Sequence, residues 1–403
     1  MSKTPLILHL ARPTYGLYLR FHHGISTAGF EHIPSTGSHL VLANHTHSLD
    51  PFFISVLYPH HIRWVAGAYL FKNQILRTLL HYLVGAIGKQ QGRSDIQTIR
   101  QIREALNRGE NVGIFPEGTR TWDGESLGFN DSIAKLVKLF KVPVVLLNLE
   151  GSYALRPRWT YLSRKGKMVI RVVEVLSAKQ INSLSVEQLH QELLQKLSFN
   201  FDSWQKEHLI PYRRKRRTSG VAQLLYSCPN CKSHSTIWDK KDRILCKKCD
   251  LVLQLDQYDT LHTLVGKPIK WTTLAQWHTW QKKEIDPQKQ PFPFDKGRLL
   301  QRGFDDKLVT LATAIDVQLE SDAIVVNMRS VPKTGMLQGI EQIIFDFDRI
   351  SSMIINTKGT LEFYHRSQLW RLRLARGRCM LKYLEWYDKR SALHASEEQK
   401  GSV

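Results

Sequence analysis

The stretch HLVLANHTHSLD, residues 39–50, joins an apolar run to a polar loop. Residues 39–43 have the length and composition of a buried strand, and the polar residues follow it directly. Four residues separate His45 from Asp50, so one turn of loop or the start of a helix can return the carboxylate to the imidazole. A carboxylate there fixes the tautomer of the ring and leaves its other nitrogen free to accept a proton. The stretch therefore predicts a general base after a strand.

The spacing of this pair carries little weight by itself. The chain has 17 histidines, and a second pair with the same spacing, His234 and Asp239, lies in a cysteine-rich segment. A short spacing of this kind recurs by chance when histidine is frequent, so we interpret the second pair as accidental. The first pair gains its meaning from another motif.

That motif is FPEGTR, residues 115–120, which follows a buried-type strand at 112–115. Gly118 permits a sharp turn and close approach of a ligand, and the planar guanidinium of Arg120 suits a phosphate. In an open α/β sheet, loops that follow strands lie at the carboxyl edge, where ligands bind. We therefore expect both motifs at one site. A surface turn in which Glu117 pairs with Arg120 is the alternative.

Residues 1–210 are predicted to form an α/β domain, with a mixed, mostly parallel sheet flanked by helices. Apolar runs alternate with segments of helical period such as 95–108, which is the pattern of strands joined by helices. The apolar runs are 39–43, 112–115, 142–149 and 168–173. Residues 14–21 carry aromatic and aliphatic side chains beside Arg12 and Arg20, which fits either a helix at a membrane interface or one packed on the domain.

Composition and charge restrict the class of protein and of partner. The chain has 403 residues and a formal net charge of +21, from 57 Lys and Arg against 36 Asp and Glu. Such an excess favours anionic partners, namely phospholipid surfaces, phosphorylated metabolites or nucleic acid. No run is apolar enough to span a bilayer, and the N-terminus lacks the features of a signal peptide. We expect a cytoplasmic protein, peripheral on the cytoplasmic face of a membrane.

Beyond residue 210 the composition changes. Residues 211–221 contain five consecutive cations, Arg213 to Arg217, and are predicted to be an exposed basic linker that could attract anionic headgroups. Residues 257–403 are predicted to hold a tryptophan-rich helix followed by a β-rich module. The predicted strands are 323–328, 343–350, 361–364 and 369–374, and an amphipathic helix with Met380, Tyr383, Leu384 and Tyr387 follows. This order resembles a pleckstrin-homology-like barrel.

Two Cys-x2-Cys pairs lie within residues 222–256, which are predicted to be a zinc ribbon. The pairs are Cys228 with Cys231 and Cys246 with Cys249, and 14 residues lie between them. Four thiolates can hold one tetrahedral zinc ion, which leaves no open position, so we expect the zinc to be structural. Cys379 stands apart and is interpreted as a small helix residue.

The two motifs together resemble the glycerolipid acyltransferase family, typified by 1-acylglycerol-3-phosphate acyltransferases. The family signature, Asn-His-x4-Asp and Phe-Pro-Glu-Gly-Thr-Arg, is present at 44–50 and 115–120, and the family's Val-Pro block resembles residues 142–145. The resemblance covers about residues 30–200. It implies transfer of a fatty acyl group from acyl-CoA or acyl carrier protein to the hydroxyl of a lysophospholipid acceptor, in phospholipid biosynthesis.

The resemblance also implies roles for individual residues. His45 would be the general base oriented by Asp50, with no catalytic cofactor. The acceptor would be bound by residues of the two motifs, namely Asn44, Glu117, Gly118, Thr119 and Arg120. The sequence departs from the family in the middle motif. The family's Lys position holds Gly67 or Ala68, its Glu position holds Tyr69, and its Arg position holds Gln91. Lys89 and Arg93 flank that position, and Arg93 is the residue predicted to replace the missing arginine.

Several alternatives stay open. The acceptor could be another lysophospholipid or glycerol-3-phosphate. A metallo-hydrolase interpretation of His45, His47 and Asp50 is disfavoured by the late Asp50 and by Pro51. The rival from another class is a zinc-ribbon module that binds nucleic acid or protein beside an inactive enzyme domain. A nucleic-acid partner is disfavoured, since no helix-turn-helix or RNA-binding aromatic motif is found.

Overall fold

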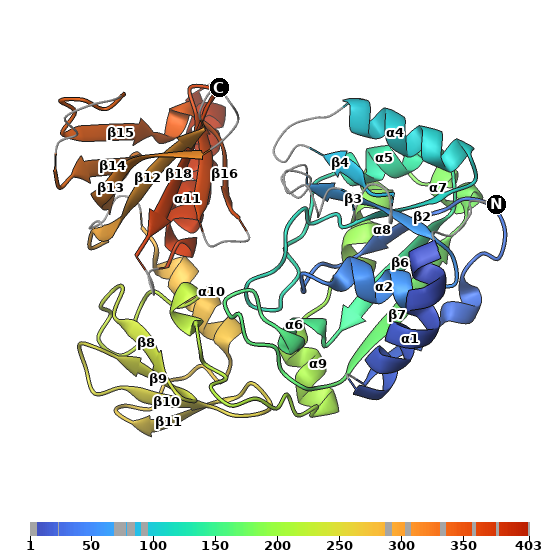
Figure 1. Ribbon diagram of the computed structural model, residues 1–403, viewed down its shortest axis with the longest axis horizontal. Helices are drawn as coiled ribbons and strands as arrows, with labels where there is room; N and C mark the ends of the chain where they lie inside the picture. The colour runs from blue at the N-terminus through green and yellow to red at the C-terminus, as the bar shows by residue number, and fades with distance from the viewer. Residues whose placement is uncertain are drawn as a thin grey trace. The chain divides into compact units, whose positions relative to one another are not determined.

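The computed structural model describes residues 6–22, 24–67, 78, 85–89, 96–286, 292–302, 308–330, 336–356, 360–375 and 379–401. The chain divides into two compact units, Met1–Arg214 and Lys215–Val403 (Figure 1). The first unit contains both motifs, and the second contains the four paired cysteines. We describe each unit by itself.

A seven-stranded sheet forms the centre of the first unit, in the order β1-β7-β6-β2-β5-β3-β4. The pair β6–β7 is antiparallel and the other five neighbouring pairs are parallel, so the sheet is mixed and mostly parallel, as the sequence predicts. The strands are β1 (Ile25–Ala28), β2 (Leu40–Ala43), β3 (Ile62–Gly67), β4 (Ile87–Lys89), β5 (Asn111–Ile114), β6 (Val144–Glu150) and β7 (Met168–Leu176).

Helices cover both faces of this sheet, because alternate side chains of its strands point into two separate cores. Val41 and Ala43 of β2 belong to one core, and Leu40 and Leu42 belong to the other. The first face is covered by α1 (Leu6–His22), α2 (Asp50–Leu57), α6 (Ser152–Leu155) and α9 (Phe201–His208). The second is covered by α4 (Ile96–Asn107), α5 (Ser132–Phe140), α7 (Ala178–Ser183) and α8 (Val186–Leu197) (Figure 1).

Helix α1 uses one side for packing and leaves the other side exposed. Gly16 and Leu19 are buried, and a Cβ on Gly16 would lie 3.2 Å from Val56 of α2. Leu10, Leu17 and Phe21 are 63%, 52% and 85% exposed and follow one another at helical spacing. Within the described residues, no helix combines the length and the apolar content needed to cross a bilayer.

The second unit holds two antiparallel sheets and two long helices. The smaller sheet has the order β11-β10-β9-β8, and the larger has the order β15-β14-β13-β12-β18-β17-β16. The smaller is built from β8 (Ile237–Lys240), β9 (Arg243–Cys246), β10 (Val252–Leu255) and β11 (Leu261–Val265). The larger is built from β12 (Asp295–Arg302), β13 (Leu308–Leu319), β14 (Ala323–Met328), β15 (Gln342–Asp346), β16 (Ile350–Ile355), β17 (Leu361–His365) and β18 (Gln368–Leu374). The helices are α10 (Leu274–Glu284) and α11 (Leu381–Gly401).

The predicted β-rich module with a terminal helix is present, with three corrections. The single strand predicted at 343–350 is wrong, because a 3-10 turn at Phe347–Arg349 separates β15 from β16. Strands β12 and β13 were not predicted, and β12 opens on charged residues that do not resemble a strand. Cys379 lies ahead of α11 rather than inside it, and its buried thiol donates a hydrogen bond to the carbonyl of Gln223.

A fully buried ion pair helps to hold the second unit together. Lys382 of α11 lies 2.6 Å from a carboxylate oxygen of Asp295 in β12, and both side chains are inaccessible to solvent. The Lys382 ammonium also donates to the hydroxyl of Ser235, next to the paired cysteines, at 3.1 Å. Removing one partner of such a pair typically costs about 3–5 kcal/mol, because the other charge stays buried and unpaired. The cysteine-rich segment is therefore attached to the β-rich module by specific polar contacts.

Candidate functional site

His45 and Asp50 meet where β2 ends and α2 begins. The His45 Nδ1 atom lies 3.0 Å from the Asp50 Oδ2 atom, and the His45 side chain is 18% exposed while that of Asp50 is fully buried. Asp50 is the first residue of α2, so the loop between them makes the single turn that the spacing predicts. The His45 Nε2 atom has no hydrogen-bond partner among the described residues, which leaves it available to a substrate.

The Asp50 carboxylate is surrounded by donors. Its Oδ2 atom also accepts the N–H groups of Thr46 and His47, at 2.8 and 2.7 Å, and its Oδ1 atom accepts the hydroxyl of Ser152 at 2.7 Å. Burial opposes ionisation, yet the hydrogen bonds and charges of His45 and His47 hold the pKa of Asp50 below its ordinary value. The carboxylate is therefore ionised at neutral pH and orients the His45 ring.

The His45 ring is held from its face by a stack of aromatic rings. It lies on Phe115, with ring centroids 4.2 Å apart, and Phe115 lies on Trp64 at 4.7 Å. Gly113 of β5 leaves the space that the Trp64 ring occupies. A Cβ at this position would lie only 2.5 Å from the ring. The Trp64 indole donates to Ser55 Oγ at 2.9 Å, which fixes the outer end of the stack.

Glu117 joins the two motifs through the main chain. Its Oε1 atom accepts the N–H of His45 at 3.0 Å, and its Oε2 atom accepts the N–H of Leu127 at 3.0 Å. The pKa of Glu117 is raised to about 7, mainly because the carboxyl group is buried. The two N–H groups oppose this rise, and the charge of Asp50 adds to it. The alternative of a self-paired surface turn is wrong at Glu117, whose two oxygens bind backbone N–H groups. Its predicted role in acceptor binding stays a prediction.

Asn44 and His47 are buried beside the base. The Asn44 Oδ1 atom accepts the N–H of Leu149 at 2.8 Å, which ties the ends of β2 and β6, and its Nδ2 atom has no partner within the described part of the chain. The pKa of His47 is lowered to about 4, mainly because the ring is buried. The charge of Asp50 opposes this lowering, and the charges of Arg156 and Arg120 contribute to it. His47 is therefore neutral, and its Nδ1 atom accepts the N–H of Leu49.

The remaining residues of the second motif form a turn at the carboxyl end of β5. Gly118 has a φ of 68°, in the left-handed region that favours glycine, and its N–H donates to the carbonyl of Phe115. The Thr119 Oγ1 atom accepts a hydrogen bond from Arg158 at 2.9 Å. Arg120 directly precedes Thr121, whose N–H donates to the carbonyl of His45 at 3.1 Å, and the charge of Arg120 lowers the pKa of His47. Arg93 lies outside the described residues.

A third segment at the site was not predicted from the sequence. It follows β6 and contains three polar side chains, those of Ser152, Arg156 and Arg158. Ser152 donates to Asp50, and Arg156 donates to Ser48 Oγ. Arg158 donates to the carbonyl of Arg120 at 2.6 Å and lies over the Trp122 ring at 4.4 Å. The signal was available, because β6, β2 and β5 are adjacent parallel strands and polar residues follow each of them.

A cavity of about 230 Å³ adjoins the two motifs on the side of α8. Asn44 and Glu117 line it together with apolar side chains, among them Ala43, Phe129, Leu194 and Leu197. The site thus combines a histidine–aspartate pair, a partly apolar cavity and several cationic side chains within a few loops.

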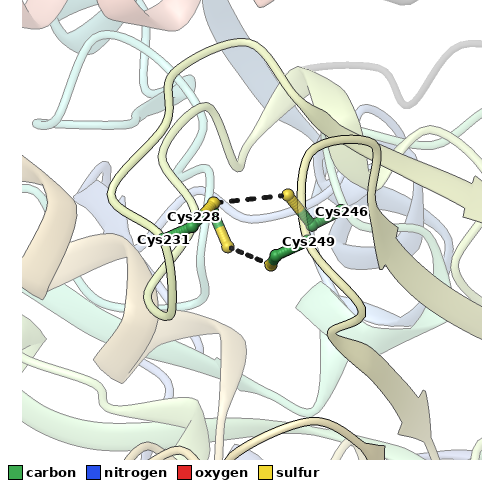
Figure 2. A group of neighbouring side chains, drawn as sticks. All are labelled: Cys228, Cys231, Cys246 and Cys249. Atoms are coloured by element: carbon green, nitrogen blue, oxygen red, sulfur yellow. Dashed lines mark hydrogen bonds between the residues drawn. The ribbon is translucent and has the colours of Figure 1, made fainter.

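The four paired cysteines gather at a second site. Their ligand atoms all lie within 4.8 Å of one another, and Figure 2 shows the sulfur atoms of two loops pointing toward a common centre. Among the described residues, this is the only cluster of three or more His, Cys, Asp or Glu side chains that could hold a metal ion. His45, His47 and Asp50 do not form such a cluster, so the metallo-hydrolase interpretation finds no support.

The distances within the cluster fit a metal rather than disulfides. The sulfur atoms of Cys228 and Cys249 are 3.8 Å apart, and those of Cys231 and Cys246 are 3.7 Å apart. A tetrahedral ion with metal–sulfur bonds of about 2.3 Å places its ligands about 3.8 Å from one another. The N–H of Lys248 and the amide of Asn230 approach two of the sulfurs at 3.4 and 3.5 Å, as donors to thiolates do.

Comparison with known proteins agrees with the geometry of the first site. Residues 24–149 match the family model described as Acyltransferase. A 1-acyl-sn-glycerol-3-phosphate acyltransferase of Bacillus subtilis (strain 168) is 26% identical over 161 residues, which are 39% of this chain and 76% of the relative. One of Helicobacter pylori (strain J99) is 27% identical over 137 residues, which are 32% of this chain and 56% of the relative.

Among solved structures, the chain is similar to the 1-acyl-sn-glycerophosphate acyltransferase of Thermotoga maritima, with a TM-score of 0.41 and 23% identity. That similarity covers 47% of this chain and 76% of the other. The matched segment 24–149 contains both motifs and the His45–Asp50 pair. Residues 24–149 are therefore similar to the acyltransferase family over the part of the chain that holds both motifs.

Proposed function

We propose that the chain transfers a fatty acyl group from acyl-CoA or acyl carrier protein to the free hydroxyl of 1-acylglycerol-3-phosphate, in phospholipid biosynthesis. The observation that carries this proposal is the His45–Asp50 contact of 3.0 Å, with the second ring nitrogen left unpartnered among the described residues. The names of the Bacillus and Helicobacter relatives support the choice of acceptor. Another lysophospholipid or glycerol-3-phosphate would use the same chemistry.

In the proposed reaction, His45 Nε2 takes the proton of the acceptor hydroxyl as the oxygen attacks the carbonyl carbon of the thioester. The C–S bond of the tetrahedral intermediate then breaks, and the departing thiolate takes the proton back from the imidazolium. Asp50 stays ionised throughout and stabilises the imidazolium, because four hydrogen-bond donors offset the cost of its burial. Asn44, Glu117, Gly118 and Thr119 would form the wall of the acceptor site, and Arg120 and Arg93 would face its phosphate.

Substitution of the catalytic pair tests the proposal. We expect His45→Ala to reduce acyl transfer to background, because no other described base occupies its place, and Asp50→Asn to reduce it by about 10²–10⁴-fold. The measurement is product formation by mass spectrometry, with acyl-CoA or acyl carrier protein as donor and a panel of lysophospholipids and glycerol-3-phosphate as acceptors.

The matched control is His234→Ala, which removes the histidine of the accidental pair and should leave turnover unchanged. In the structure His234 contacts the hydroxyl of Ser227 and the ring of Phe292, not Asp239, which receives the N–H of Gly220. Wild-type turnover in His45→Ala would contradict the proposed mechanism, whereas equal loss in both variants would indicate a folding defect.

The raised pKa of Glu117 predicts a pH dependence of stability. Between pH 4.5 and about 7 the folded protein keeps a proton on Glu117 that the unfolded chain has released, so stability falls as pH rises across this window. We expect the free energy of unfolding to lose up to about 3 kcal/mol from this group, and Glu117→Gln to abolish that part of the slope. Urea denaturation of both proteins from pH 4.5 to 7.5 measures the difference, and identical slopes would contradict the prediction.

We further propose that the four-cysteine site holds one structural zinc ion. Cys228, Cys231, Cys246 and Cys249 would be its ligands, and the sulfur separations of 3.7 and 3.8 Å support this assignment. Zinc would supply the folding free energy that a module this small lacks in its own apolar core, about 10–16 kcal/mol in zinc-finger peptides.

Metal analysis tests the zinc site directly. The protein purified without chelator should contain one zinc per chain, and Cys246→Ser should lower that content because a thiolate ligand is lost. Cys379→Ser is the matched control, since burial raises the pKa of this thiol to about 12 and its sulfur contacts Gln223 instead of the cluster. Absence of zinc from the wild-type protein, or its loss from Cys379→Ser alone, would contradict the assignment.

We also propose that the protein binds the cytoplasmic face of a membrane through α1 and the basic block. The exposed stripe of Leu10, Leu17 and Phe21 supports apolar insertion, and the exposed Arg213 to Arg216 support attraction to anionic headgroups. Arg217 is part-buried instead, and its N–H donates to Asp242, so the predicted linker is not exposed throughout.

Vesicle binding tests this arrangement. Anionic vesicles should bind the protein more strongly than neutral ones, and the double variant Leu17→Ser with Phe21→Ser should weaken the part that persists in high salt, because apolar burial is not screened. Ile96→Ser, at a residue 82% exposed on α4, is the control and should leave binding unchanged. Tight DNA binding with a steep salt dependence and no vesicle binding would contradict the membrane proposal.

A further inference from the structure

The segment after β6 brings a cation to the base from outside both motifs. Arg156 directly follows the short helix α6, whose first residue, Ser152, donates to Asp50 at 2.7 Å. The preceding Gly151 has a φ of 79° and is closely surrounded, since a Cβ there would lie 2.4 Å from the Tyr212 hydroxyl. The position of Arg156 is therefore set by the same carboxylate that orients the base.

Among the residues that the structure describes, no carboxylate neutralises the guanidinium of Arg156. Its hydrogen bond goes to the hydroxyl of Ser48, which is uncharged and lies three residues from His45, and no carboxylate of the described residues pairs with it. Arg156 is half-buried, and burial lowers its pKa, which reflects the cost of holding this charge without a counter-ion. A guanidinium has five N–H groups in a planar fork, so donors remain for an anionic ligand.

A second cation belongs to a segment bonded to the same loop. Arg156 donates to Ser48 Oγ, and Arg120 directly precedes Thr121, whose N–H donates to the carbonyl of His45 at 3.1 Å. In agreement with this placement, the charges of both arginines lower the pKa of His47. Arg158 acts differently, because it donates to Thr119 and to the carbonyl of Arg120 and lies over Trp122. Arg158 is therefore interpreted as a residue that positions the main chain of Arg120.

We propose that Arg156 and Arg120 together bind the phosphate of the acceptor, with Arg156 as a binding residue that neither motif contains. This inference rests on the proposed function. In 1-acylglycerol-3-phosphate the free hydroxyl and the phosphate sit on adjacent carbons, so a phosphate must lie beside the base when the hydroxyl reaches it. The phosphates of coenzyme A are separated from the thioester by the pantetheine arm, which places them farther from His45.

Binding of two soluble probes separates these sources of phosphate. Titration calorimetry with sn-glycerol 3-phosphate should show about 10- to 100-fold weaker binding for Arg156→Ala, as expected for loss of a charge-assisted contact, while binding of coenzyme A should change little. Arg156→Lys should keep part of the affinity because it keeps the charge but not the fork. Arg100→Ala, at an exposed arginine of α4, is the control for loss of one positive charge.

Two further measurements exclude a merely structural role. Ser48→Ala removes the hydroxyl that Arg156 contacts and should leave glycerol 3-phosphate binding within a few-fold of wild type. In turnover, Arg156→Ala should raise KM for 1-acylglycerol-3-phosphate but not for a monoacylglycerol, which lacks the phosphate. Circular dichroism verifies that each variant is folded.

The inference is overturned if the wild-type protein fails to bind glycerol 3-phosphate, or if Arg156→Ala binds it as tightly as the wild-type protein does. It is equally overturned if Ser48→Ala loses as much affinity for glycerol 3-phosphate as Arg156→Ala does. It is also overturned if coenzyme A is the probe whose binding is lost. Phosphate binding that depends on Arg156 in a protein without acyl transfer would reject the proposed reaction and leave the phosphate site standing.

Discussion

The buried carboxylate of Asp50 is the constraint on which the site depends. A carboxylate fully removed from water is costly unless several donors surround it. Here the donors come from the His45 ring, from two backbone N–H groups of the loop, and from Ser152 of a segment about a hundred residues away. Satisfying this one group therefore fixes the loop after β2, the start of α2 and the position of α6 at once.

A second carboxylate, Glu117, holds the two sequence motifs to each other. It binds the N–H of His45 on one side and that of Leu127 on the other, so a shift of either loop breaks a hydrogen bond at a partly buried charge. The environments move the two acidic pKa values in opposite directions, with Asp50 lowered and Glu117 raised. Asp50 is suited to a permanent charge beside the His45 ring, and Glu117 is the group whose charge depends on pH near neutrality.

The second unit uses buried polar contacts in a comparable way. Gln281 of α10 accepts the N–H of Tyr226 and donates to the carbonyl of Leu224, directly before the first cysteine pair. His278 and Tyr226 both contact Glu385 of α11, and Lys382 joins α11 to Asp295 and Ser235. The cysteine-rich segment and the β-rich module consequently share one network of buried polar contacts.

The local elements could be read from the sequence because they depend on neighbouring residues. Apolar runs gave the strands at 40–43, 111–114 and 144–150, the helical period gave α4, and the regular spacing gave the His45–Asp50 and cysteine pairs. The contacts of Ser152, Arg156 and Glu117, and the burial of Lys382, were decided only by the tertiary structure. These side chains are polar and leave no periodic pattern. Each has a partner 72 to 108 residues away along the chain, namely Asp50, Ser48, His45 and Asp295 respectively, so only the order of strands in the sheet and the packing of α11 bring them together.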